Sequence, residues 1–339
     1  MGFKMKVFIL GDINIDLITN IGVIPKAGED VRADGMQTSI GGAAVNTSVV
    51  YSKLTGQAPF LIGCVGIDQF GDELINSLNG NNINCKFVSR SNTTATGQIM
   101  VIVTADGERT MISWRGANEQ LLPESIQLGM FEGAHGLYVS GYCFLRPPQS
   151  EAAVRVIKLA HQTGLHVFVD TAYDPAIQFP QRFHKVFPFI DTLVMGKEDG
   201  ISLTGHSEKT EMIKSLLESG IRQVALKIGR DGCVLADKHE VVELSGFEVN
   251  ALDSTGAGDA FCAGLIVATL NELPILQRAV LANALGALST TVKGSGLNLP
   301  GRDALICFLE EMIKKDLRAE LANPIESLLI FLRKEYQRE

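Results

Sequence analysis

The chain has 339 residues, of which 46% are hydrophobic and 20% are charged. This composition is typical of a globular protein and excludes collagen-like and intrinsically disordered chains. Acidic residues outnumber basic ones by 38 to 30, giving a net charge of −8 and an isoelectric point near 5.4. Because the sequence has neither a basic excess nor a basic cluster, we expect no nucleic-acid partner.

The six cysteines are scattered without a C-x-x-C pair, and most of them lie inside apolar runs. This spacing predicts neither a zinc site nor a disulfide framework, and it favours a reducing compartment. The four apolar residues 7–10 are too few for a secretory signal. The longest near-apolar stretch, residues 260–270, is shorter than the ~18 residues that span a bilayer. We therefore expect a soluble, cytoplasmic protein without a membrane partner.

Short apolar runs alternate with helical patterns through the first two thirds of the chain. This alternation predicts an α/β fold with a mostly parallel sheet and helices on both faces. The expected strands are residues 6–10, 59–65, 136–140, 166–170, 192–195 and 223–228. The expected helices are residues 41–56, 70–78, 149–163, 181–187 and 208–219.

Residues 14–40 and 93–116 break this rhythm, because apolar and polar residues alternate there with turn signals between them. Residues 98–115 predict a hairpin that turns at Asp106-Gly107. Antiparallel strands inserted into a parallel-sheet protein indicate a small separate sheet, and in enzymes such a sheet often forms a lid over a crevice. An edge decoration without a role is the alternative.

The last third of the chain is helical in pattern, with helices expected at 257–271, 274–292 and 301–315. Residues 316–339 predict one more helix, capped by Asn323 with Pro324 at its first position. We expect a single domain of residues 1–315 with the lid inserted, followed by this C-terminal helical extension. The extension has one apolar face at helical spacing, made of Ile325, Leu328, Leu329 and Leu332.

The segment most informative about chemistry is residues 253–261, Asp-Ser-Thr-Gly-Ala-Gly-Asp-Ala-Phe, at the start of an apolar helix. Glycines there let the backbone approach a ligand, and the free N–H groups of a helix start bind anions. The Asp259 carboxylate would repel a bound phosphate, so its presence there indicates a catalytic role, such as accepting a proton from an attacking hydroxyl. A plain helix cap by Ser254 or Thr255 is the alternative. The chain has no Walker A and no G-x-G-x-x-G pattern, so a nucleotide site would be of another kind.

Two further segments place polar groups beside glycines. Residues 11–16, Gly-Asp-Ile-Asn-Ile-Asp, follow the first strand at a carboxyl end, where α/β proteins bind ligands. Asp12, Asn14 and Asp16 alternate, so they face one side and suit a polyol; an Asp/Asn-rich turn is the alternative. Residues 41–46, Gly-Gly-Ala-Ala-Val-Asn, permit close backbone approach before a helix, as would any tight strand-to-helix turn.

Together these segments resemble the ribokinase (PfkB) family of carbohydrate kinases. Residues 253–261 resemble its D-T-x-G-A-G-D-x-F signature, residues 41–46 its G-G-x-x-x-N element, and residues 11–16 its first-strand motif. The resemblance runs in order from about residue 6 to 314. It implies a ribokinase-like three-layer sandwich with a β lid that often also clasps a second subunit, hence a homodimer. It also implies an ATP-dependent kinase that uses Mg²⁺ to transfer the γ-phosphate to a sugar hydroxyl.

The resemblance assigns roles to single residues. Asp259 resembles the general base, and the N–H groups of Gly256, Ala257 and Gly258 resemble the anion hole. The resemblance implies a sugar-binding set of Asp16, Gly41, Gly42 and Asn46, to which Asp12 and Asn14 are added as candidates. It implies a nucleotide-binding set of Lys227, Gly229, Gly232 and Asn283.

The sequence also departs from the family pattern. Of the family's N-x-x-E, Asn is replaced by Gly196 and Glu by Asp199, which is still a candidate for holding a metal-bound water. Ala43 stands where ribokinase has Lys, and Ala172 stands where the family often has Asn, so the chain differs from ribokinase proper. By resemblance to potassium-activated relatives, K⁺ is a further candidate, held near Asp253 and Ser295.

Three readings of the function follow. A sugar kinase leads, and a nucleoside or pseudouridine kinase is the alternative. For the latter, Met100, Ile102 and Trp114 are candidates for an apolar platform under a base, and the core of the lid is an equal alternative for these three residues. A non-catalytic sugar-binding regulator is disfavoured, because binding alone needs no base such as Asp259. Arg115, near the end of the hairpin, is a candidate contact to the substrate or its new phosphate; a surface arginine beside a packed tryptophan is the alternative.

Overall fold

The computed structural model describes residues 5–315 and 319–334. Its largest element is a sheet in which seven parallel strands are extended by an antiparallel pair at one edge. Across the described sheet, the strands run in the order β5 (Asn84–Ser91), β4 (Phe60–Gly66), β1 (Val7–Leu10), β8 (Gly136–Ser140), β9 (His166–Asp170), β10 (Thr192–Gly196), β11 (Gln223–Lys227), β12 (Cys233–Asp237) and β13 (Val241–Leu244).

Helices cover both faces of this sheet, because its strands are apolar on both sides. In β1, Val7 and Ile9 join one core while Phe8 and Leu10 join the other, and all four are fully buried. The first core is covered by α1 (Ala43–Thr55), α2 (Gln69–Gly80), α8 (Ala257–Leu270), α9 (Ile275–Ser289), α10 (Arg302–Lys314) and α11 (Ala319–Lys334). The second is covered by α3 (Gln149–Gln162), α4 (Tyr173–Gln178), α5 (Pro180–His184), α6 (Lys197–Thr204) and α7 (Lys209–Glu218).

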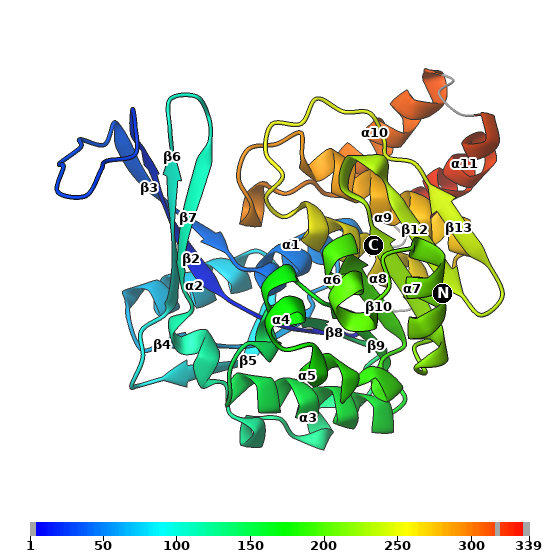
Figure 1. Ribbon diagram of the computed structural model, residues 1–339, viewed down its shortest axis with the longest axis horizontal. Helices are drawn as coiled ribbons and strands as arrows, with labels where there is room; N and C mark the ends of the chain where they lie inside the picture. Colours follow the sequence, from blue (N-terminus) through cyan, green and yellow to red (C-terminus); the bar gives the residue numbers. More distant parts are fainter. Residues whose placement is uncertain (1–4, 316–318, 335–339) are drawn as a thin grey trace.

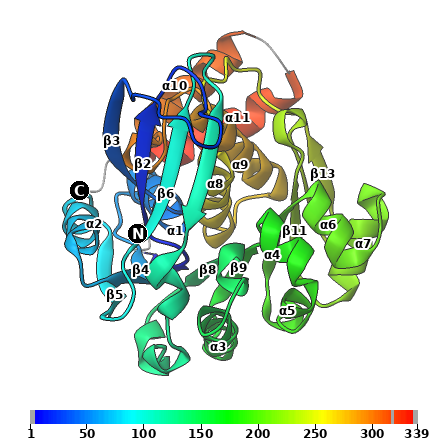
Figure 2. The same ribbon diagram turned by 60° about the vertical axis from the view of Figure 1, so that its left-hand side comes forward.

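A second, smaller sheet stands away from the body at the left of Figure 1, and Figure 2 turns it toward the viewer. Its strands, in spatial order, are β3 (Gly35–Gly41), β2 (Asn14–Asn20), β6 (Gly97–Val103) and β7 (Arg109–Trp114). The three layers and the small sheet confirm the predicted fold class. We call the small sheet the lid.

The predicted elements differ from the structure mainly where elements are short or at an edge. Strands β5 and β12 and helices α4 and α6 were not predicted, and the helix expected at 181–187 is the five-residue α5. Helices of one or two turns are too short to show a helical period, and the half-exposed β5 lies at the sheet edge.

The prediction that Asn323 caps the C-terminal helix is wrong. Helix α11 already includes Ala319, so Pro324 lies inside it. Leu321 is buried and continues the apolar face one turn back from Ile325, so packing favours the longer helix despite the hydrogen bond that Pro324 cannot donate. The predicted apolar face is buried as expected: Ile325, Leu328, Leu329 and Leu332. In the described residues, no helix combines the length and apolar character needed to cross a membrane.

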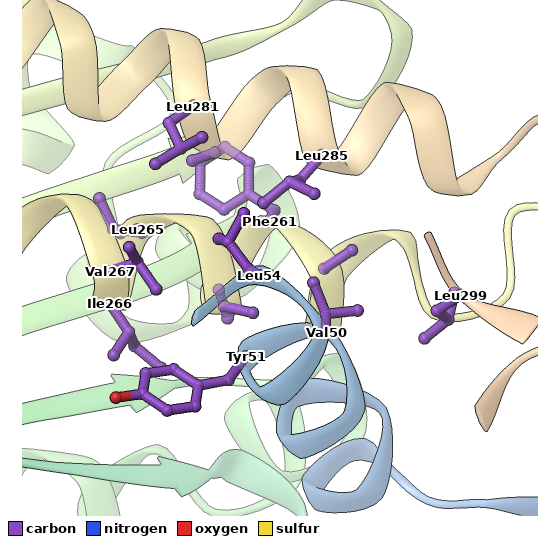
Figure 3. Close-up of a cluster of buried hydrophobic side chains, with 14 of the residues drawn as sticks. Val50, Tyr51, Leu54, Phe261, Leu265, Ile266, Val267, Leu281, Leu285 and Leu299 are labelled. Carbon is purple, nitrogen blue, oxygen red and sulfur yellow. The ribbon is translucent and has the colours of Figure 1, made fainter. Parts of the chain in front are cut away.

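Helix α8 is packed tightly between α1 and α9, which matters because the 253–261 motif leads into it. Figure 3 shows Phe261 and Leu265 of α8 between Tyr51 of α1 and Leu285 of α9. Gly264 permits the close approach of α8 to α9, since a Cβ at this position would lie 2.8 Å from a Leu285 methyl carbon. The start of α8 is therefore held by a rigid core.

Candidate active site

A cavity of about 700 Å³ lies between the lid and the carboxyl ends of the central strands. Its lining includes most of the predicted site residues: Asp12, Asn14, Asp16, Gly42, Asn46, Arg115, Asp199, Lys227, Gly256, Asp259 and Ser295. Seven predicted residues lie outside the lining: Gly41, Ala257, Gly258, Gly229, Gly232, Asp253 and Asn283. The structure therefore brings the expected acceptor groups together with the start of α8.

Asp259, in the first turn of α8, is held by Asn46 of α1. The Asn46 amide donates a hydrogen bond to Asp259 Oδ2 at 2.7 Å, and its carbonyl accepts one from the Gly296 N–H at 2.8 Å. Burial raises the pKa of Asp259 to about 7, against the lowering effect of the Asn46 hydrogen bond; the negative charge of Asp170 raises it and Lys227 lowers it. A carboxylate with such a pKa can accept a proton near neutral pH.

The start of α8 is shaped by Gly256, which has a positive φ of 82°. Only glycine adopts this conformation without strain, and it turns the chain so that α8 starts at the cavity. The N–H of Ala257 donates to the Ser254 carbonyl at 3.2 Å. A Cβ at Gly258 would lie 3.3 Å from Lys227 Nζ. The N-terminus of α8 and a lysine ammonium thus lie close together at the cavity, where Gly256 and Lys227 line it, an arrangement that suits an anion.

Lys227, at the end of β11, forms an ion pair with Asp170 at the end of β9. Their Nζ and Oδ1 atoms are 2.8 Å apart. The strand between them, β10, ends in Gly196, where a Cβ would lie 3.5 Å from Asp199 Oδ2. Burial alone would lower the pKa of Lys227, but the adjacent Asp170 carboxylate raises it above its usual value. The ammonium group therefore remains charged at neutral pH.

Arg115 lies in the cavity wall, but its guanidinium is bound to Asp12. Nε and Nη2 donate to the two Asp12 oxygens at 2.9 and 2.6 Å. Gln149, at the start of α3, accepts from Nη2 at 2.7 Å and donates to Asp12 at 3.2 Å. The carboxylate thus occupies the paired donor edge of Arg115, whereas the buried Nη1 has no hydrogen-bond partner in the described structure, so a contact to substrate or phosphate stays a prediction.

The segment before the lid is fixed by Asn118. Its amide donates to Asn14 Oδ1 at 2.7 Å, and its carbonyl accepts from the Ile13 N–H at 2.8 Å. Burial raises the pKa of Asp16 to about 6, although Ser295 and Arg109 act to lower it. Gly42, at φ 101°, approaches the Asp12 carbonyl so closely that a Cβ would overlap it. These contacts hold Asp12, Asn14 and Asp16 on one wall, as the alternation of residues predicted.

The metal-binding prediction rests on Asp199, which lines the cavity. Its Oδ2 accepts hydrogen bonds from Thr171 Oγ1 at 2.5 Å and from the Gly196 N–H at 3.0 Å. Among the described residues, no group of three or more His, Cys, Asp or Glu side chains could hold a metal ion. This donor set fits Mg²⁺ as that ion is usually held, by one or two carboxylates, waters and substrate phosphates.

The inner face of the lid lines the cavity with Ile99, Val101 and Met111. Strand alternation places Met100 and Ile102 on the opposite face, so the expectation that they could hold a base is wrong. Trp114 does line the cavity and is about half exposed. The same alternation brings Arg109 inward, where it donates to Thr255 Oγ1 at 2.9 Å and forms an ion pair with Asp253.

Several residues of the site were missed in the sequence. Arg109 shares the alternation of Met111, so its position could have been read from the hairpin. Gln149, Asn118 and Tyr142 gave no comparable signal, because long-range packing brings them to the cavity. Of the predicted nucleotide set, Asn283 donates to the Ser245 carbonyl at 3.0 Å and so joins α9 to the loop after β13.

Comparison with known proteins identifies the family of this chain. The model of the pfkB family carbohydrate kinases matches residues 4–302. The chain belongs to the pfkB family of carbohydrate kinases. It is therefore a phosphotransferase with an alcohol group as acceptor, and the predicted family resemblance is confirmed.

Its relatives include a probable fructokinase-4 of Arabidopsis thaliana, 26% identical over 319 residues, which cover 88% of this chain and 95% of the relative. A ribokinase of Haemophilus influenzae is 26% identical over 309 residues, covering 89% of this chain and 97% of the relative. Among solved structures, an Arabidopsis thaliana ribokinase complexed with ribose and ATP matches with a TM-score of 0.78 and 23% identity. That match covers 90% of this chain and 99% of the other.

Proposed function

We propose that this protein is an ATP-dependent kinase that transfers the γ-phosphate to a hydroxyl group of a small sugar. The observation that carries the proposal is the placement of Asp259. Its partly buried carboxylate lies at the N-terminus of α8, in the cavity that Asp12, Asn14 and Asp16 also line. Asp259 accepts the proton of the attacking hydroxyl, while the N–H groups of Gly256, Ala257 and Gly258 stabilise the transferring phosphoryl group.

The remaining residues of the cavity bind and orient the sugar and ATP. The sugar hydroxyls are bound by Asp12, Asn14, Asp16, Gly42 and Asn46. Each hydroxyl can both donate and accept a hydrogen bond, so it can pair with carboxylate and amide groups. Lys227 neutralises charge on the ATP phosphates, and Asp199 holds a water of the Mg²⁺ that accompanies ATP. Mg²⁺ would stabilise the charge that develops on the phosphates.

A nucleoside kinase is the second candidate, because apolar side chains line the lid side of the cavity. Ile99, Val101, Met111 and Trp114 could cover a base. A coupled ATP-consumption assay across sugars and nucleosides separates the two. Turnover with a nucleoside and with no free sugar would replace the leading proposal.

Asp259→Asn tests the mechanism in the same assay. We expect kcat to fall by roughly 10²–10⁴ with nucleotide affinity nearly unchanged, because the variant keeps the shape and loses the base. Near-normal turnover would refute the assignment of Asp259.

We also propose that the protein is a homodimer built through the outer face of the lid. Met36, Met100 and Ile112 are 76, 44 and 59% exposed on that face. Apolar side chains on an exposed sheet face favour association. Sedimentation at micromolar concentration tests this proposal, with Ile112→Lys as the variant expected to dissociate. A wild-type monomer would contradict it.

A requirement for K⁺ near Asp253 and Ser295 is a weaker part of the proposal. The Asp253 carboxylate pairs with Arg109 and accepts from the Gly294 N–H at 2.7 Å, so a cation would bind chiefly through backbone carbonyls. Equal activity in KCl and in NaCl of the same ionic strength would remove K⁺ from the proposal.

A further inference from the structure

All cations that line the cavity already have a carboxylate partner. The three are Arg109, Arg115 and Lys227. They pair respectively with Asp253, Asp12 and Asp170. An acceptor that enters the cavity therefore meets none of these three cations without a carboxylate partner.

Carboxylates are in excess in the same lining. Six acidic side chains line it, namely Asp12, Asp16, Asp170, Asp174, Asp199 and Asp259. In the described part of the chain, four of the six have no ion-pair partner: Asp16, Asp174, Asp199 and Asp259. A carboxylate on the acceptor would add a further negative charge to this wall, which costs free energy in a partly desolvated site.

The hydrogen bonds of Arg115 add a second reason why a carboxylate on the acceptor would bind poorly. Its Nε–Nη2 edge, the fork that would bind a substrate carboxylate, is closed by Asp12, and Gln149 takes a further donor of Nη2. Glu119 adds negative charge 3.8 Å from Nη1. The Asp12 carboxylate, in turn, accepts three N–H donors and keeps about one of its roughly four acceptor positions, which a hydroxyl group can fill.

We propose that the Asp12–Arg115 pair makes the acceptor site selective for an uncharged sugar and against the corresponding sugar acid. This inference rests on the proposed sugar-kinase function and adds its charge selectivity. Asp12 is then a specificity-determining residue: it binds a hydroxyl, and by closing the Nε–Nη2 edge it removes the paired donors that would bind a substrate carboxylate, leaving only Nη1, beside Glu119, without a hydrogen-bond partner in the described structure. Discrimination thus comes from a repulsive element as well as from an attractive one.

The experiment compares two matched pairs of acceptors that differ only in oxidation at C1. These are D-ribose with D-ribonate, and D-fructose with 2-keto-D-gluconate. Wild-type protein is expected to have a higher kcat/KM for the neutral member of each pair that it phosphorylates. A wild-type preference for the acid would overturn the inference while leaving the kinase function intact.

Asp12→Asn keeps the side-chain shape but frees the Arg115 charge. The ratio of kcat/KM for acid over neutral acceptor should rise by roughly 10- to 100-fold, the gain of one charge-assisted hydrogen bond to a buried cation. Asp174→Asn is the matched control, because it removes one exposed carboxylate of the same cavity and frees no guanidinium. Its ratio should change by less than about fivefold. Equal changes in both variants would refute the role of the pair.

Binding supplies a second readout that needs no turnover. The rise in melting temperature caused by each of the four compounds, measured with and without Asp12→Asn, should follow the same order as kcat/KM. If no compound is phosphorylated, the kinase proposal fails, and these binding shifts still decide the charge selectivity. The wild-type comparison also stands alone should the variant fail to fold.

Discussion

Arg109, which lines the cavity from the lid, forms an ion pair with Asp253 of the segment that leads into α8. Arg109 also donates to Thr255 Oγ1 at 2.9 Å. Burial alone would raise the pKa of Asp253, but the N–H groups of Thr255 and Gly294, with the charge of Arg109, hold it below its usual value. The carboxylate is therefore ionised at neutral pH, and its partner ties the lid to the body.

Arg109→Met should weaken lid closure. We expect KM for the sugar to rise by roughly 5- to 30-fold, since a charge-assisted contact in a partly buried pair contributes about 1–2 kcal/mol. Lys209→Met is the control, because Lys209 pairs with Glu243 on an exposed surface away from the lid. Steady-state kinetics at saturating ATP measure the effect. A KM unchanged in Arg109→Met would mean that the ion pair does not govern closure.

The pH dependence of kcat should report Asp259. Its pKa is raised to about 7, and the base works only when it is deprotonated. Activity is therefore present above about pH 7 and falls as the pH drops through that value. Asp259→Asn should abolish this transition in whatever activity remains. A wild-type profile that stays flat from pH 8 to about pH 5 would contradict a raised pKa in a catalytic Asp259.

Asp16 should affect sugar binding and leave ATP binding intact. Its Oδ1 is buried and has no hydrogen-bond partner in the described structure, so a sugar hydroxyl can supply one. Asp16→Ala is expected to weaken sugar affinity by about tenfold or more, measured by calorimetric titration with the true acceptor. Because its pKa is raised to about 6, wild-type sugar affinity should also fall below that pH. Equal affinities in wild type and variant would refute the contact.

The sequence predicted this fold and much of its site for a physical reason. Apolar runs mark the buried strands, and glycines beside polar residues mark strand ends and helix starts, so local patterns place Asp12, Asp16 and Asp259 correctly. Hydrogen bonds between side chains of distant segments leave no such local pattern in the sequence. The Asp12–Arg115 pair joins residues that are 103 apart in sequence, and Gln149 joins them from another helix. Hence the sequence suggested Arg115 as a candidate substrate contact but gave no sign that Asp12 binds its guanidinium.

The contribution of the Lys227–Asp170 ion pair to stability should be separable from the contribution of Lys227 to activity. Lys227→Met leaves the largely buried Asp170 without its cation, so we expect a loss of about 3–5 kcal/mol in the free energy of unfolding. Adding Asp170→Asn should restore most of the stability, because the uncompensated charge is gone. Activity should stay low in both variants, since the ammonium that we propose to neutralise the ATP phosphates is absent. Recovery of activity in the double variant would mean that Lys227 acts only through Asp170.

The C-terminal helix offers a test of stability outside the segment that the family model covers, which ends at residue 302. Leu328 of α11 is fully buried in the core that also contains α8 and α9 residues, whereas Ile330, two positions on, is 53% exposed. Leu328→Ala should lower the free energy of unfolding by about 2–5 kcal/mol, because it removes buried methyl groups and leaves a cavity. Ile330→Ala is the matched control and should cost less than about 1 kcal/mol. Urea unfolding followed by circular dichroism gives both values. If the two substitutions cost the same, α11 does not contribute to the core through this face, and the burial of its apolar stripe has no energetic weight.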